Sequence, residues 1–444
     1  MQLSRRIFLR STASAVMVGG MMASGKIFGA NDRIPVAVLG VNGRGRRHLS
    51  VEETDKENRA GFNGAGSNDV GAEVVAICDP DGRVMEKRLA QCKEDFGKAP
   101  KAYRDMREVF ADDGIAAVSI ATPNHWHTLA TVWACQAGKD VFVEKPLSHT
   151  FWEGKQVVAA AKKYNRIVQH GTQSRAHTNW VRLMQRVRAG AIGDIYMSRG
   201  VCFKGRGPIG FAEAAEPPAE LDWNLWQGPA DAAAYCDSYV PYNWHWFWNY
   251  GNGDIGNQGV HQMDLAVWGL DPKELPVQVS SHGGRYGYKD QGETPNTQGA
   301  AFTYADGRTL EFSVRGLFTN DEGGQTVGNL LYGSKGYAAG DKLYQPGGSE
   351  LPDEGEGAAD ILVDGNQYRA FLKAVRTRDE KYIAGTAAQG HLSCAHIHLA
   401  NIAYRLQRSI KVDPKTETIV GDAEASALLT RAYRGELTVP ELAV

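Results

Sequence analysis

The 444-residue sequence has few cysteines and almost no net charge. Six cysteines are scattered along it without any Cys-x-x-Cys pair, which argues against a zinc ribbon or a redox dithiol. A net charge of -2 gives no reason to expect a nucleic acid or an anionic membrane surface as a partner. No internal repeat stands out. The length suits two domains, and 43% hydrophobic and 23% charged residues are ordinary for a globular protein.

The first 30 residues form an expected export signal. Arg5-Arg6-Ile-Phe-Leu9 precedes an apolar run of small residues from Ala13 to Ala23. A basic head before a short apolar stretch is typical of a secretion signal, and the paired arginines indicate the twin-arginine type. The run is too short to span a membrane. We therefore expect a periplasmic or otherwise exported protein with no stable membrane anchor. An exported protein meets little free cofactor, so we expect any cofactor to be tightly bound.

Strands and helices alternate over residues 31–172, which predicts a doubly wound parallel sheet of the Rossmann type. Residues 51–70 are polar and glycine-rich, and we expect a loop insertion there. The predicted strands are Arg33–Leu39, Ala72–Cys78, Ile115–Ala121, a run ending at Glu144, and Ile167–Gln169.

A glycine-rich turn follows the first predicted strand. Gly40-Val-Asn-Gly-Arg-Gly45 fits Gly-x-Gly-x-x-Gly, with Asn42 in the second glycine's place. The pattern predicts a turn whose following helix presents backbone N–H groups to a pyrophosphate, although a plain strand-turn-helix has the same pattern. Asp79, at the end of the second strand, suits the ribose hydroxyls of NAD and disfavours the 2′-phosphate of NADP, unless it is merely solvated.

The third strand leads into Thr122-Pro-Asn-His-Trp-His127, which we expect to line the cofactor cleft. A metal at His125 and His127 is disfavoured because no carboxylate or cysteine lies beside them, and no metal site is expected. The predicted cofactor-binding residues are Gly40, Asn42, Gly43, Arg44, Gly45, Asp79, Thr122, Pro123, Asn124, His127, Glu144 and Lys145.

The stretch Val141-Phe-Val-Glu-Lys-Pro146 reads as a buried strand that ends in a charged pair and a proline. The carboxyl end of a strand in an α/β sheet is where such folds place their chemistry. Residues 173–444 follow a different pattern, with strands and long loops and then C-terminal helices. They predict an α+β domain with a large, mainly antiparallel open sheet for substrate binding and oligomerisation.

Three features together resemble the glucose–fructose oxidoreductase / inositol dehydrogenase (Gfo/Idh/MocA) family: the glycine turn, Glu144-Lys145-Pro146, and the glycine-rich segment from Gly251 to His261. The resemblance implies hydride transfer between a nicotinamide and a carbon of a sugar or polyol. It implies Lys145 and His261 as the catalytic acid/base residues, and a homodimer or homotetramer. The family usually has an aspartate four residues before this histidine, where this sequence has Asn257. On one helix, Asn257 and His261 would share a face, and Asp264 one turn later would orient His261 or lie at the surface.

Aromatic residues cluster before the histidine segment, with tryptophans at 223, 226, 244, 246 and 248. Flat rings pack against the C–H faces of sugars, so we expect substrate contacts there beside ordinary core packing. The predicted substrate residues are Arg175, Gln173, Tyr242, Trp244, Trp246 and His261, with His177 as a further guess. His396 and His398 are expected to be structural. Two alternatives stay open: an NAD-cycling glycosidase that works by oxidation, elimination and reduction, and a non-catalytic sugar- or dinucleotide-binding protein.

Overall fold

The computed structural model describes residues 32–49, 61–62, 71–353, 362 and 365–443. The expected export signal and nearly all of the expected 51–70 insertion lie outside these residues. Of the insertion, Gly61 and Phe62 are described, and Phe62 is fully buried against His48, Phe142 and Tyr368.

The N-terminal domain is a six-stranded parallel sheet in the order β3-β2-β1-β4-β5-β6, as predicted. Every residue of β4 and β5 is buried because helices cover both faces of the sheet. The short edge strand β3 was not predicted from the sequence. The strands are β1 (Ile34–Leu39), β2 (Ala72–Cys78), β3 (Lys101–Tyr103), β4 (Ala117–Ile120), β5 (Asp140–Glu144) and β6 (Val168–Gly171).

Several helices of this domain begin at a side-chain cap. Asp81 accepts a hydrogen bond from the backbone of Arg83, and Thr150 accepts one from Glu153, which satisfies amides that the first turn leaves free. The helices are α2 (Arg44–Leu49), α3 (Gly82–Phe96), α4 (Met106–Ala111), α5 (Asn124–Gln136) and α6 (Phe151–Lys163).

The C-terminal domain contains a nine-stranded sheet in the order β13-β12-β11-β7-β10-β9-β8-β14-β15. It is mainly antiparallel, as predicted, and the pairing of β7 with β10 is its parallel exception. Its strands are β7 (Ile195–Phe203), β8 (Gln278–Gly284), β9 (Thr297–Thr303), β10 (Thr309–Arg315), β11 (Val327–Gly333), β12 (Gly336–Ala339), β13 (Lys342–Tyr344), β14 (Ile410–Asp413) and β15 (Thr418–Ile419).

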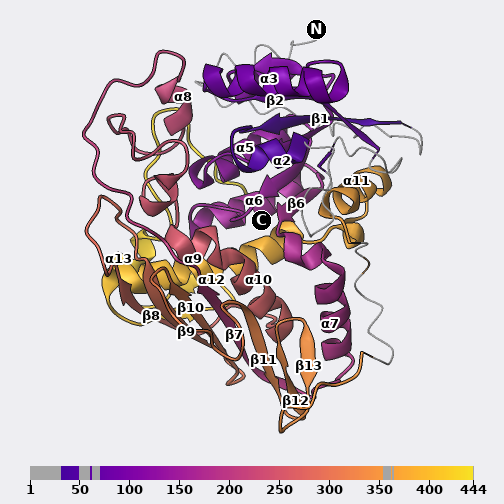
Figure 1. Cartoon of the computed structure of the whole chain (residues 1–444), viewed down its shortest axis with the longest axis vertical. Helices are drawn as coiled ribbons and strands as arrows, with labels where there is room; N and C mark the ends of the chain where they lie inside the picture. The colour runs from indigo at the N-terminus through magenta and orange to yellow at the C-terminus, as the bar shows by residue number, and fades with distance from the viewer. Residues whose placement is uncertain (1–31, 50–60, 63–70, 354–361, 363–364, 444) are drawn as a thin grey trace.

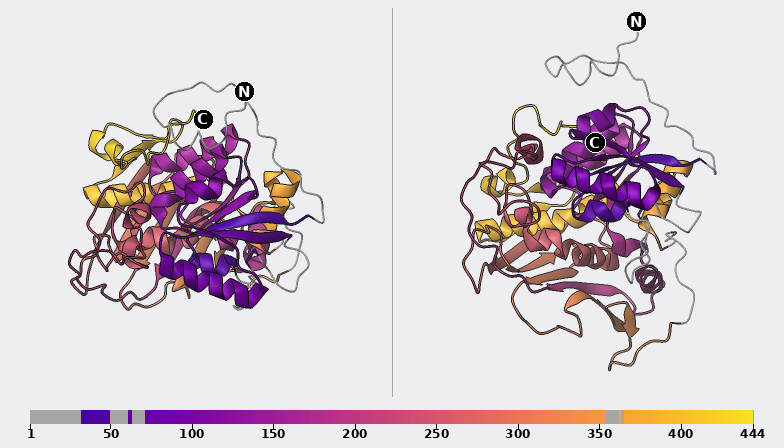
Figure 2. Two further views of the ribbon diagram at one scale, coloured as in Figure 1. Left: turned by 90° about the horizontal axis from the view of Figure 1, so that it is seen from above. Right: turned by 45° about the horizontal axis from the view of Figure 1, so that its top comes forward.

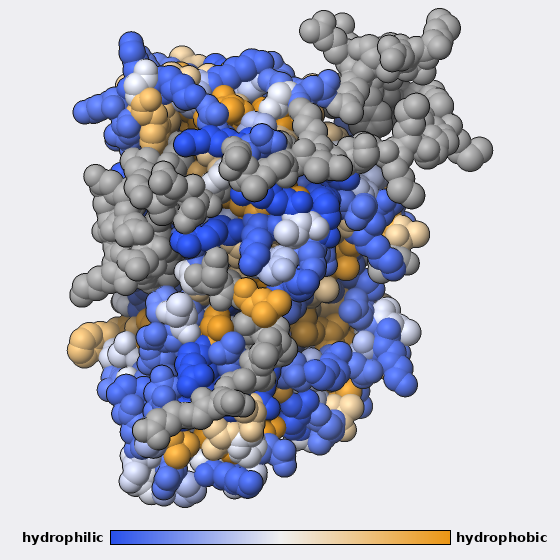
Figure 3. Space-filling model, turned by 90° about the vertical axis from the view of Figure 1, so that its right-hand side faces the viewer, coloured by the Kyte–Doolittle hydropathy of each residue, from blue (hydrophilic) through white to orange (hydrophobic). Residues whose placement is uncertain are grey.

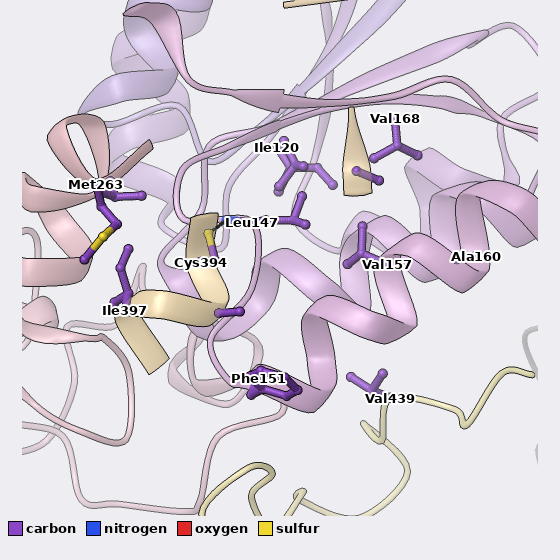
Figure 4. Packing of buried hydrophobic residues seen from close by; sticks show 14 of the residues in the cluster. Ile120, Leu147, Phe151, Val157, Ala160, Val168, Met263, Cys394, Ile397 and Val439 are labelled. Atoms are coloured by element: carbon purple, nitrogen blue, oxygen red, sulfur yellow. Dashed lines mark hydrogen bonds between the residues drawn. The ribbon is translucent and has the colours of Figure 1, made fainter. Parts of the chain in front are cut away.

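Helices α10 and α12 lie between the two sheets (Figure 1). Figure 4 shows the core that joins the domains there, with Leu147 just after β5 lying against Cys394 of α12. The backbone N–H of Leu147 donates to the Cys394 sulfur at 3.3 Å. The helices of this half are α7 (Thr178–Arg188), α8 (Trp223–Gln227), α9 (Gly253–Asn257), α10 (Gly259–Leu270), α11 (Gln367–Thr377), α12 (Ala387–Leu406) and α13 (Ala423–Ala427).

Two later segments return to the N-terminal domain. Helix α11 lies beside the N-terminal domain (Figure 2). Its Tyr368 and Phe371 pack into the core that contains residues of β1. Near the C-terminus, Arg431 forms an ion pair with Glu153 of α6, and the Leu442 N–H donates to Gln156. Segments from well beyond residue 172 therefore pack against the N-terminal domain.

The face of the molecule seen in Figure 3 is mainly hydrophilic, and its apolar side chains form small, scattered patches. In the described part of the chain, no helix combines the length and the apolar character that crossing a bilayer requires.

Candidate functional site

A cavity of about 610 Å³ lies at the carboxyl ends of β1, β4 and β5. Strand order reverses between β1 and β4, and ligands of open α/β sheets bind in the crevice at such a point. One wall comes from the N-terminal domain, and segments of the C-terminal domain close the other side. The predicted residues that line it are Gly40, Asn42, Gly43, Arg44, Asp79, Thr122, Pro123, Asn124, Glu144, Lys145, Gln173, Tyr242, Trp244, Asn257 and His261.

The turn after β1 needs glycine for two separate reasons. Gly40 has φ +77°, and a Cβ there would lie 2.8 Å from the Ala121 carbonyl oxygen of the neighbouring strand end. At Gly45 a Cβ would lie 1.8 Å from the Gly40 oxygen, so α2 packs closely on the turn. Gly45 does not itself line the cavity. Asn42 and Gly43 do, and space at Gly43 is open to a ligand.

Asp79 lies at the far end of the cavity and is buried. Its carboxylate accepts hydrogen bonds from the backbone of Val41 at 2.9 Å and of Asp81 at 3.1 Å. Burial raises its pKa to about 6, so the group is still ionised at pH 7. Each oxygen keeps acceptor capacity for a further donor, which fits the ribose hydroxyls of a dinucleotide.

The side chain of Thr122 offers a ligand a further hydrogen-bonding group. Its hydroxyl is buried at the cavity wall and has no hydrogen-bond partner among the described residues. A buried hydroxyl without a partner is costly, and a bound polar group would relieve that cost. With the glycine turn and Asp79, the residues present fit an extended dinucleotide.

Lys145 points across the cavity to the C-terminal domain. Its ammonium donates to the Asn257 carbonyl oxygen at 2.6 Å and lies 3.4 Å from the Asn257 side-chain oxygen. Burial lowers its pKa to about 8, although the neighbouring Glu144 charge opposes that change. A useful fraction of this lysine is therefore neutral near physiological pH.

Asn257 and His261 do not share one continuous helix, which corrects the expectation. Helix α9 ends at Asn257 and α10 begins at Gly259, and the His261 N–H bonds to the Gln258 carbonyl oxygen at 3.3 Å. The carbonyl of Asn257 is thereby released from the helix ladder and is free to receive Lys145. The Asn257 amide also donates to the Tyr242 hydroxyl at 3.2 Å.

His261 is half-buried and faces the cavity from α10. Burial and then the nearby Lys145 charge lower its pKa to about 3, so its imidazole is neutral at pH 7. Its ring has no hydrogen-bond partner in the described part of the chain. A neutral ring of this kind offers one donor and one acceptor to a ligand hydroxyl.

Glu144 is buried and does not pair with the side chain of Lys145. It accepts from Arg44 Nε at 2.8 Å and from His48 Nε2 at 3.0 Å, both at the same oxygen. Although burial alone would raise it, the Arg44 charge and the His48 hydrogen bond hold the pKa of Glu144 well below its usual range. His48 was missed in the sequence, since no local pattern links it to a residue 96 positions away.

Several predicted residues lie elsewhere. His127 does not line the cavity, because its ring contacts the Pro146 carbonyl at 2.6 Å and that of Thr122 at 2.9 Å. Arg175 is fully engaged by Asp264 in a buried ion pair, which also excludes Asp264 from orienting His261 through a direct hydrogen bond. His177 occupies the N-cap position of α7, without a side-chain capping hydrogen bond, and is not among the residues that line the cavity.

The aromatic cluster mainly forms a small core. Trp223 stacks on Trp226 with ring centroids 4.8 Å apart. Trp246 is buried under the Arg285 guanidinium and does not reach the cavity, which corrects its expected role. Trp226 and Trp244 do line it. His125 packs against Trp226, and no metal ligands gather around it in the described part of the chain.

His396 and His398 are buried in α12 away from the site, as expected. The first bonds the Tyr304 hydroxyl and the second that of Ser148. Residues from distant segments also cover the cavity. No sequence pattern predicted this cover, because its residues are far apart in the sequence. Among the covering residues are Leu221, Asn224, Leu225, Glu436 and Leu437.

Comparison with known proteins agrees with this arrangement. The profile described as "Oxidoreductase family, NAD-binding Rossmann fold" matches residues 34–172. The profile described as "Oxidoreductase family, C-terminal alpha/beta domain" matches residues 205–439, which is more than half of the chain.

Curated relatives match over shorter stretches. Levoglucosan dehydrogenase of Pseudarthrobacter phenanthrenivorans is 34% identical over 195 residues, 44% of this chain and 41% of the relative. Inositol 2-dehydrogenase of Salmonella typhimurium is 32% identical over 131 residues, 29% of this chain and 38% of the relative. The chain thus spans about two fifths of the length of these relatives.

A solved structure shares the fold over nearly its whole length. The WlbA dehydrogenase from Bordetella pertussis, in complex with NADH and UDP-GlcNAcA, superposes with a TM-score of 0.62 at 18% identity. It covers 86% of this chain and 99% of that one. With both domain profiles matched in order along a chain of the same architecture, this protein belongs to the Gfo/Idh/MocA oxidoreductase family.

Proposed function

We propose that this protein is an NAD-dependent dehydrogenase that oxidises a CH–OH group of a sugar, polyol or glycoside to a ketone. The observation that carries the proposal is the meeting of Lys145, Asn257 and His261 at the cavity beside the glycine turn. The relatives named above are dehydrogenases of inositol and levoglucosan, which supports a carbohydrate substrate.

Lys145, His261 and Asn257 each have a separate role in the proposed reaction. When bound, the nicotinamide supplies the hydride acceptor. Lys145, with a pKa of about 8, takes the hydroxyl proton in its neutral form. His261 is neutral and orients the same hydroxyl or a neighbouring one. Asn257 cannot carry charge, so it holds Lys145 through its carbonyl and does not act as a proton acceptor.

We propose NAD over NADP as the cofactor, and tight binding. The Asp79 carboxylate lies where a 2′-phosphate would have to be accommodated, and like charges repel. The cover formed by Leu221, Leu225 and Leu437 would slow release of the adenosine half. Purified protein that carries no dinucleotide and binds NAD no better than NADP would contradict this.

The test of the activity is an assay of the mature protein with NAD and a panel of sugars, polyols and glycosides. Nicotinamide absorbance and released sugar are followed together. Reduced nicotinamide without cleavage supports the proposal. Sugar release without net reduction would instead identify an NAD-cycling glycosidase, and binding without either reaction would favour a sensor.

We further propose export through the twin-arginine route and assembly into a homodimer or homotetramer. Replacing Arg5 and Arg6 by lysine should retain the protein in the cytoplasm, while the unchanged protein is recovered from the periplasm. Light scattering of the purified protein gives the mass of the assembly, and a monomer would contradict the second proposal.

A further inference from the structure

A buried chain of hydrogen bonds ends at Glu144. The Ser119 hydroxyl of β4 lies 2.7 Å from His48 Nδ1, and His48 Nε2 lies 3.0 Å from the Glu144 carboxylate. Ser119 and His48 are fully buried and Glu144 nearly so. Arg44 Nε donates to the same carboxylate oxygen at 2.8 Å.

The chain has one consistent set of proton positions. An ionised carboxylate only accepts, so the His48 proton is on Nε2. Nδ1 then accepts from the Ser119 hydroxyl, which fixes the tautomer. Burial lowers the pKa of His48, which agrees with a neutral ring. His48, the glycine-turn residue Arg44 and Ser119 thus hold one carboxylate in one place.

The position of this carboxylate gives it a consequence for the ligand. Glu144 lines the cavity at the end of β5 and contacts Arg44 of the glycine turn, whereas Asp79 follows β2, on the other side of the point between β1 and β4 where the strand order reverses. With the adenosine half at Asp79, the nicotinamide half lies toward Glu144 and Lys145. Oxidised nicotinamide carries one positive charge more than the reduced ring. Although Arg44 balances part of it, the fixed negative charge of Glu144 in a partly dry site favours the oxidised ring.

We propose that Ser119, His48 and Arg44 are positioning residues that keep Glu144 as a fixed carboxylate, and that this charge makes the site bind NAD⁺ in preference to NADH. The inference rests on the proposed dinucleotide site and deepens it by assigning which redox form of the cofactor that site holds more tightly.

The other titratable groups that face Glu144 do not take over the role of this hydrogen-bond chain. Burial lowers the pKa of each of the three histidines among them, and Lys145 stays mostly protonated below pH 7. These groups are Lys145 at the strand end, His127 on α5, His170 on β6 and His261 on α10.

The test compares four variants with the unchanged protein: His48→Phe, Ser119→Ala, Glu144→Gln and His396→Phe. The last is a matched control, since His396 is equally buried, bonds a hydroxyl and a carbonyl, and packs on Phe302 far from the cavity. Protein loaded with NADH is titrated with NAD⁺ between pH 5.5 and 7.5, and loss of NADH fluorescence gives the ratio of the two dissociation constants.

In the unchanged protein and in His396→Phe, the preference for NAD⁺ should be level with pH. In His48→Phe it should fall, by up to about tenfold, toward pH 5.5, because loss of the His48 hydrogen bond raises the pKa of Glu144 and leaves Arg44 alone to oppose the effect of burial. Ser119→Ala should show a smaller fall, and Glu144→Gln a low preference at every pH. Asp79 also titrates in this pH range, but the adenosine half that it would bind is the same in NAD⁺ and NADH. Its effect therefore cancels in the ratio of the two dissociation constants.

The proposal is overturned if His48→Phe keeps an unchanged preference that does not vary with pH. If His48→Phe does not fold, the same result in Ser119→Ala overturns it. An unchanged preference in Glu144→Gln also overturns it. Infrared titration gives a readout without cofactor: a protonated carboxyl band should appear in His48→Phe at a higher pH than in the unchanged protein, and vanish in the double variant with Glu144→Gln. Because neither measurement needs turnover of a sugar, failure of the dehydrogenase assay is seen separately.

Discussion

The ammonium of Lys145 is held 2.6 Å from the backbone carbonyl of Asn257, in the other domain. This contact exists because the helix is interrupted between α9 and α10, so that no backbone N–H of a helix donates to that carbonyl. A main-chain oxygen cannot titrate. The lysine therefore has a partner that orients it without holding its proton as a carboxylate would, and the predictions below follow from that arrangement.

Lys145→Met should lower kcat/KM for sugar oxidation by about 10²–10⁴-fold, the usual contribution of a general base. In the unchanged enzyme, activity should rise with pH through about 8, because burial places the lysine pKa there and the neutral form is the base. The measurement is kcat/KM from pH 6 to 10. An unshifted pH limb in a still active Lys145→Met would assign the base elsewhere.

Asn257→Asp should move that limb to higher pH by about one unit. A carboxylate at the position of the side-chain oxygen, 3.4 Å from Lys145, would stabilise the ammonium. Asn257→Ala is the matched control, since it keeps the backbone carbonyl and adds no charge. A limb that stays in place in Asn257→Asp, or moves equally in both variants, would show that the side chain does not govern the lysine.

Arg175→Met should act on stability and not on substrate affinity. The Arg175–Asp264 pair is buried and bidentate, and the carboxylate also receives hydrogen bonds from Thr172 and Ser393. Removing one partner strands a buried charge, at a cost of about 3–5 kcal/mol.

Denaturant unfolding of Arg175→Met measures this cost, with Arg182→Met as a control, since Arg182 pairs with the exposed Asp353 and not with a buried carboxylate. Although burial alone would raise it, Arg175 holds the pKa of Asp264 below its usual value. The stabilisation is therefore present above about pH 4 and lost as the pH falls further. A raised KM with unchanged stability would restore Arg175 as a substrate residue.

Trp244→Ala should raise KM for the sugar roughly tenfold while kcat changes less, because an aromatic face on a sugar ring contributes binding in ground and transition states alike. Trp248→Ala is matched to it: both rings are half-buried, but Trp248 lies outside the cavity, under Arg405. Equal effects of the two substitutions would remove Trp244 from the substrate site.

Most of the fold, and the residues at the two ends of the site, could be predicted from the sequence. Periodic apolar runs gave the strands, and Gly40 could be read as obligatory because a turn of that shape admits little else. Asp79 and Lys145 follow from their places at strand ends. What escaped prediction depends on tertiary contacts: the partner of Arg175, the burial of Trp246, and the break that separates Asn257 from His261. His48 has no signature at all, since its meaning comes from Glu144.

The most direct test of the central claim uses NAD⁺ and a sugar substrate deuterated at the carbon to be oxidised. The account predicts that the deuterium appears at C4 of the nicotinamide, with one keto-sugar formed for each NADH, and that Lys145→Met slows both together. Keto-sugar or free sugar formed while the nicotinamide stays unlabelled would contradict it, as would NADH that carries no deuterium.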